Sequence, residues 1–106
     1  MADSPRLSLA RVARDTALAD PGVHALDSGL GGVRCTVSGT ERVEGVVSAA
    51  EGVGGYALEV HVVALPEDLH ALGDRLRAAV ERAADDQGLR ERLSAVSVRV
   101  EDVVEP

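Results

Sequence analysis

The sequence predicts an α+β fold in which two helices pack on one face of a mostly antiparallel sheet. Two segments repeat apolar residues at helical spacing, and four shorter ones alternate apolar and polar residues. Their order along the chain is helix, strand, strand, strand, helix, strand. Because the chain has 106 residues and no internal repeat or long linker, we expect a single domain over residues 1–106.

The first helix is expected from about Pro5 to Ala19. Ser4 is a favourable N-cap residue, and Pro5 then occupies the first helical position. Residues 20–22, Asp-Pro-Gly, end the helix because proline cannot continue its hydrogen-bond ladder. Leu18 lies off the apolar stripe, so it either folds back on Val23 or is exposed for a partner.

Three strands are expected between the helices. The first has Val33, Cys35 and Val37 inward, alternating with polar residues, and a second covers about residues 43–47. Residues 52–55, Gly-Val-Gly-Gly, predict a hairpin turn into a third strand over residues 56–65. One face of this strand carries the apolar residues Leu58, Val60, Val62 and Ala64.

The second helix is expected to open at Pro66, with acidic residues in its first turn near the positive end of the helix dipole. Gly73 interrupts it, and close packing against a strand would explain a glycine there. Arg77 and Glu81 are expected to pair one turn apart. The apolar stripe of this helix consists of Leu69, Leu72, Leu76, Ala79, Val80 and Ala83.

The last strand is expected to direct Val96, Val98 and Val100 towards the helices. The opposite face of the sheet is then polar enough to be solvated, and it is the largest surface left uncovered. The residues expected on this open face are Arg34, Thr36, Glu59, His61, Arg99 and Glu101.

Composition excludes several classes of function. The net charge is -7, and all 11 basic residues are arginines, so the cation clusters that bind phosphate backbones are not expected and neither is a nucleic-acid partner. No uncharged stretch approaches the roughly 20 residues that span a bilayer, so we expect a cytoplasmic protein without direct membrane insertion. The single cysteine permits neither an internal disulfide nor a zinc site with several thiolates.

Two pairs of side chains suggest chemistry. Cys35 and His61 are residue types that form a nucleophile and its base, but the alternation places them on opposite faces of the sheet. His70 and Asp74 lie one helical turn apart, which is typical of a solvated surface pair and also of half a metal site. We expect a surface pair, because no second histidine shares that turn.

Glycine-rich loops and paired acids complete the candidates. Residues 29–32 and 52–55 are rich in glycine, but they precede strands, whereas a nucleotide loop precedes a helix N-terminus. Asp85 and Asp86 are expected in a loop, and Glu51 is isolated in a turn. The sequence therefore predicts no catalytic, cofactor-binding or metal-binding residue.

Three stretches jointly resemble a known family. The first is Val12-Ala13-Arg14-Asp15-Thr16-Ala17-Leu18 followed by Pro21-Gly22-Val23, Leu26 and Gly29. The second is Leu65-Pro66-Glu67 followed by Leu72, Leu76, Arg77, Ala79, Val80 and Glu81, and the third is Val96-Ser97-Val98-Arg99-Val100-Glu101-Asp102-Val103. In this order and spacing, the chain resembles a divergent, actinobacterial-type member of the alkaline shock protein family of bacterial envelope stress response proteins.

This resemblance implies a non-enzymatic protein that self-associates as a homo-oligomer and is held at the inner face of the cell membrane by a small anchor protein, with no cofactor. A core of Val, Leu and Ala, with Tyr56 as the only aromatic residue, also favours self-association, because small side chains bury little apolar area. Two alternatives remain. One is a small cytosolic regulatory module that binds a ligand or protein on the open sheet face, and the other is an enzyme that uses Cys35.

Overall fold

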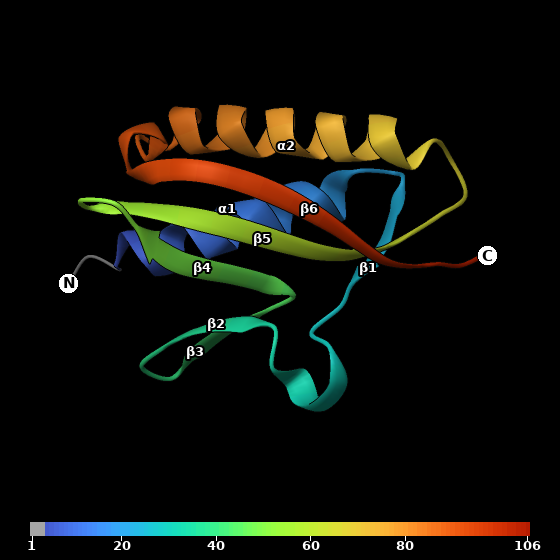
Figure 1. Cartoon of the computed structure of the whole chain (residues 1–106), viewed down its shortest axis with the longest axis horizontal. Coiled ribbons are helices and arrows are strands. Elements are labelled where there is room, and N and C mark those ends of the chain that lie inside the picture. The colour runs from blue at the N-terminus through green and yellow to red at the C-terminus, as the bar shows by residue number, and fades with distance from the viewer. Residues whose placement is uncertain (1–3) are drawn as a thin grey trace.

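The computed structural model describes residues 4–106 and has the predicted α+β fold. Two helices pack with a mostly antiparallel sheet (Figure 1). The helices are α1 (Pro5–Ala19) and α2 (Leu69–Asp86), with short 3-10 turns η1 (Leu30–Gly32) and η2 (Arg90–Arg92). The strands are β1 (Val23–Leu26), β2 (Cys35–Ser38), β3 (Glu41–Glu44), β4 (Val46–Glu51), β5 (Gly55–Ala64) and β6 (Leu93–Val103).

The first helix has the predicted bounds, whereas the second begins later than predicted. The side chain of Ser4 accepts a hydrogen bond from the N–H of Leu7 at the start of α1. At α2, the Asp68 carboxylate accepts from the N–H of Ala71 at 3.1 Å, so Asp68 is the N-cap and Pro66 lies in the preceding loop. Neither α1 nor α2 is long and apolar enough to cross a membrane.

The central strand β5 has two differently built sides. Along one side it pairs antiparallel with β4 over Gly55 to Val60 and then with β1 over Val62 to Ala64. Along the other side it pairs in parallel with β6. Figure 1 shows β4, β5 and β6 with α1 behind them and α2 along the outer side of β6.

Two strands are present beyond those predicted. β1 directly follows the turn that ends α1, and its four residues are too few for a clear alternating pattern. The expected strand over residues 43–47 is divided by Gly45, which has a φ of 81° and separates β3 from β4. The predicted order of helix, strands, helix and strand is otherwise confirmed.

The β2–β3 pair is a separate two-stranded ribbon, and its predicted orientation is wrong. Thr36 is buried with 1% of its surface exposed, whereas Val37 is 45% exposed and Cys35 is half-buried. The Thr36 hydroxyl donates to the carbonyl of Val46 at 2.8 Å and accepts from the N–H of Ser48 at 3.0 Å. Because these bonds attach the ribbon to β4, the hydroxyl faces inward and its neighbours do not.

The core lies between the helices and one face of the sheet, as predicted. The apolar face of β5 is fully buried, and the valines of β6 pack against it. Leu18 of α1 is 52% exposed. In α2, Leu69 is 39% exposed, so the buried stripe of this helix is narrower than expected. The buried residues of α2 are Leu72, Leu76, Val80 and Ala84.

Candidate functional site

His61 lies where the partner of β5 changes from β4 to β1. Its N–H donates to the carbonyl of Gly45 at 2.8 Å, and its carbonyl accepts from the N–H of Asp27 at 2.9 Å. The residues that follow β1 and precede β4 therefore meet at a single residue of β5.

The side chain of His61 is held between two carboxylates. Its Nδ1 lies 2.8 Å from Oε1 of Glu101, and its Nε2 lies 3.0 Å from Oε1 of Glu59. Arg34 adds a fourth member, with Nη1 3.3 Å from Oε2 of Glu101. These four residues form the His61 cluster. Arg34 lies in the loop before β2 and not in a strand, and the expectation that His61 is solvated is wrong, since only 5% of it is exposed.

A β-bulge brings Glu101 into this cluster. Val62 pairs with Val100 and Val63 pairs with Asp102, so Glu101 is an extra residue in β6. The register shift lets the Glu101 carboxylate reach both His61 and Arg34. Alternation alone could not reveal this, because the pattern of β6 gives no sign of a shift after Val100.

The His61 cluster joins three parts of the chain. Both ring nitrogens of His61 contact carboxylates, and Glu101 also contacts Arg34. These contacts link β5, β6 and the loop of Arg34.

Cys35 and His61 do not form a nucleophile and base pair. Cys35 lies in the β2–β3 ribbon opposite Glu44, outside the sheet that contains His61. Both nitrogens of His61 contact carboxylates. The expectation that Cys35 points into the core is also wrong, because Thr36 takes the inward position.

His70 and Asp74 line a groove instead of forming a pair. Asp74 Oδ1 accepts from Nη2 of Arg77 at 2.6 Å, so its partner is Arg77 and not His70. The predicted Arg77–Glu81 pair is replaced accordingly, since Glu81 contacts Arg90. Within residues 4–106, no group of three or more His, Cys, Asp and Glu side chains is arranged to hold a metal ion.

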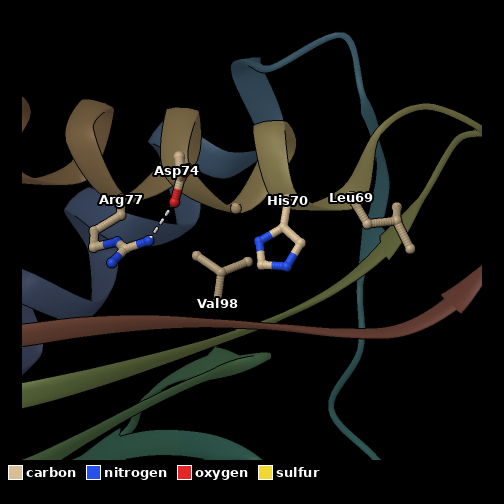
Figure 2. A pocket seen from close by; sticks show the side chains of 6 residues that line it. Leu69, His70, Asp74, Arg77 and Val98 are labelled. Carbon is tan, nitrogen blue, oxygen red and sulfur yellow. Dashed lines mark hydrogen bonds and ion pairs between the residues drawn. The ribbon is translucent and has the colours of Figure 1, made fainter.

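A groove lies between α2 and β6. One part, of about 350 Å³, lies between the N-terminal half of α2 and Val98, which points towards it (Figure 2). A second part, of about 290 Å³, continues along the start of β6, and Arg77 lines both. The linings are Leu69, His70, Gly73, Asp74, Arg77 and Val98 for the first part, and Arg77, Glu81, Arg90, Leu93, Ser94, Ala95 and Val96 for the second.

Gly73 leaves this groove open. A Cβ added to Gly73 would meet nothing within 4 Å, so the expectation of close packing against a strand is wrong. Glycine in a helix costs about 1 kcal/mol relative to alanine. Here the missing side chain corresponds to empty space above Val98 instead of a tight contact.

The outer edge of β6 carries unused backbone groups. In a strand, successive residues direct their N–H and C=O groups to opposite sides. The backbone N–H and C=O groups of His61 point towards Gly45 and Asp27. Those of its neighbours Val60 and Val62 therefore point towards β6, where they bond to the residues on either side of Val98 and Val100. The backbones of Val96, Val98 and Val100 therefore point outward, and within residues 4–106 no strand pairs with that edge.

A charged cluster fixes the start of α2 to the end of α1. Arg75 donates to both carboxylate oxygens of Asp20, from Nε and Nη2 at 2.8 Å each, and to Glu67 at 3.0 Å. The hydrogen bond from Arg75 lowers the pKa of Asp20, and the same bond raises the pKa of Arg75. The carbonyl of Gly22 accepts from the N–H of Leu65 at 3.0 Å, so the first two family-like stretches meet here as structural turns.

The remaining candidates lie apart from these features. Residues 29–32 contain η1 and lead into β2, and residues 52–54 join β4 to β5, so neither glycine-rich loop precedes a long helix. Asp85 and Asp86 lie in the last turn of α2 and not in a loop, and both are exposed. Glu51 is exposed at the end of β4.

Comparison of the chain with protein-family models, with curated proteins and with solved structures finds no match in any of the three.

Proposed function

We propose that this chain is a non-catalytic interaction protein of the bacterial envelope stress response, which self-associates and binds a membrane-anchored partner. The observation that carries the proposal is the outer edge of β6, which no strand of residues 4–106 pairs with, together with the groove beneath α2. An unpaired strand edge is suited to contact with another polypeptide.

The positions of the family-like stretches support the same proposal. Gly22 of the first stretch accepts a hydrogen bond from Leu65 of the second, and Glu67 of the second stretch contacts Arg75, so these residues determine chain geometry. The third stretch is β6, which offers the free edge. Residues shared with an interaction family therefore either form the framework or supply a contact surface.

Localisation tests this proposal. The protein is produced in its source cells with and without the genes adjacent to its own, and membrane and cytosolic fractions are compared before and after envelope stress. We expect recruitment to the membrane fraction only when a small membrane protein is co-produced, and its co-purification with the chain. A chain that stays entirely cytosolic beside every neighbouring membrane protein contradicts anchoring.

A second candidate is a small cytosolic regulatory module that binds a ligand or protein on the open sheet face. The observation that favours it is the pair of exposed residues Ser97 and Arg99 beside the His61 cluster, since Arg99 has no ion pair within residues 4–106. The localisation experiment separates the two functions. A regulatory module stays cytosolic beside every neighbouring membrane protein, and Arg99→Glu should abolish its regulation through the open face.

A further inference from the structure

We propose that the outer edge of β6 and the groove beneath α2 form one peptide-binding site, which takes an extended, acidic segment of a partner protein with apolar residues at alternate positions. The segment adds to the sheet as a strand beside β6. This inference deepens the proposed function, on which it rests, by naming the surface and the chemistry of the partner.

The backbone of β6 provides the first half of the recognition. Val96, Val98 and Val100 direct their N–H and C=O groups away from β5, at the two-residue spacing of alternate positions in an added strand. Hydrogen bonds to these groups hold any extended segment and do not depend on its side chains. Selectivity must therefore come from the surfaces on either side of the edge.

The groove favours an apolar side chain on the face of the added strand that meets α2. Val98 points into the space below α2 (Figure 2), and Leu69 and Gly73 line the same space from the helix. Since nothing lies within 4 Å of a Cβ added at Gly73, the hollow accepts a valine or leucine from the added strand. The second part of the groove, beyond Arg77, is lined mainly by polar side chains and does not add to this preference.

Charge complementarity selects an acidic segment. Arg99 is exposed on the open face of β6 without an ion pair in the described chain, so it can pair with a carboxylate from the added strand. On the other face, Arg77 and Arg90 line the groove, but each is paired with an acidic residue of the same lining, Asp74 or Glu81. The groove therefore carries no excess positive charge, and the preference for an acidic segment comes from Arg99.

The position of α2 favours a single strand over a second complete copy of the chain. Figure 1 shows α2 along the outer side of β6, and the groove lies between the two elements. A two-fold pairing of β6 with itself would bring a second α2 to the same place. One extended segment needs no such space.

Amide hydrogen exchange reports the binding residue by residue. The probe is a short labelled peptide in which valine and glutamate alternate, and the charge control has lysine in place of glutamate. In the free protein, the amides of Val98 and Val100 should exchange quickly, whereas those of Ser97 and Arg99, which face β5, should be protected. The Val/Glu peptide should slow exchange at Val98 and Val100, and the Val/Lys peptide should not.

Filling the groove provides the matched variants. Gly73→Leu places a side chain in the hollow and replaces glycine with a better helix former, so the fold should be kept while peptide affinity falls about tenfold or more. Ala78→Leu makes a similar change on the exposed side of α2 and should bind as the wild type does. Arg99→Glu should reverse the preference between the Val/Glu and Val/Lys peptides.

Three results overturn the inference. One is saturable Val/Glu binding that Gly73→Leu leaves unchanged, and another is protection away from β6. The third is a concentration-dependent dimer that Gly73→Leu dissociates, which makes a second copy the occupant. Membrane recruitment that persists in Gly73→Leu refutes this site and leaves the proposed function standing, whereas loss of recruitment in the wild type refutes the proposed function whatever the peptide does.

Discussion

The two sides of β5 differ in how fully the neighbouring segments are held in place by hydrogen bonds. On one side, β4 and β1 share the strand, and their junction is fixed by the bond from His61 to the carbonyl of Gly45, by the bond from Asp27 to the carbonyl of His61, and by the His61 cluster. On the other side, β6 runs the full length of β5 and leaves its outer edge and the adjacent groove open. The closed side holds the fold together, and the open side is available for contact.

The difference teaches where substitutions should be costly. At the junction, a single residue meets three chain segments, so a change in shape or charge has nowhere to relax. At the groove, space is already empty, so added volume should be tolerated or even favourable. Stability measurements on variants of the two sides therefore test this difference directly.

The largest effect is expected at Gly45. An alanine there would place its Cβ 2.6 Å from Cβ of Leu26, in a backbone conformation with φ of 81°. We expect Gly45→Ala to lower the free energy of unfolding by about 3 kcal/mol, from backbone strain and steric overlap together. Urea denaturation measures the loss.

The matched control is Gly54→Ala. Gly54 has a φ of 73°, but nothing lies within 4 Å of the added Cβ, so only the backbone term of about 1 kcal/mol applies. Equal losses for the two variants would show that the junction is no tighter than a hairpin turn, and the comparison would fail.

The next effect is expected at His61. Replacing it with alanine leaves the carboxylates of Glu59 and Glu101 facing an empty space without their shared donor. We expect a loss of about 2 kcal/mol in the free energy of unfolding. His61→Gln retains one donor and should recover part of this loss, measured by the same denaturation. If His61→Gln lowers the free energy of unfolding as much as His61→Ala does, the packing of the ring matters more than its hydrogen bonds.

Most of the fold could be predicted because periodicity reports the faces of regular elements. The bounds of α1, the buried face of β5 and the inward valines of β6 all follow from spacing alone. Periodicity fails where a strand has no extended sheet to pack on. Cys35 and Thr36 show this, because β2 has one strand partner and the hydroxyl of Thr36 replaces the missing ladder bonds.

The candidate sites were harder to predict because they depend on register and on empty space. Glu59, His61 and Glu101 could be assigned to one face, but the bulge that brings Glu101 to the histidine is a tertiary feature. Gly73 is unusual inside a helix, but a sequence cannot distinguish a glycine that permits tight packing from one that leaves a hollow. The positions of β6 and α2 decide that question.

On the open side, Gly73→Ala should stabilise the protein. The added methyl group meets nothing within 4 Å, and alanine is favoured over glycine in a helix by about 1 kcal/mol. Thermal denaturation should show a higher melting temperature. Ala78→Gly, at an exposed position of the same helix, should lower it by a similar amount. If Gly73→Ala instead destabilised the chain, the groove would be closed by contacts that the structure does not contain.

The smallest effect is expected at Arg75, which links α2 to the turn after α1. Its hydrogen bond lowers the pKa of Asp20, so the pair stabilises the fold fully above the ordinary aspartate pKa of about 3.9. As pH falls through the lower pKa of Asp20 in the folded state, the carboxylate is protonated and this contribution is lost. Arg75→Met should therefore be less stable than the wild type at neutral pH, and the difference should shrink in acid.

Arg77→Met is the matched control for this pH dependence. Arg77 lies on the same helix and pairs with Asp74, but both side chains are largely exposed, with 49% and 72% of their surfaces accessible. Exposed pairs contribute little to stability, so Arg77→Met should change both the stability and its pH profile less than Arg75→Met does. Identical profiles for the two variants would mean that the link between α2 and the turn after α1 is an ordinary surface contact, and that α2 is held in place by its buried leucines alone.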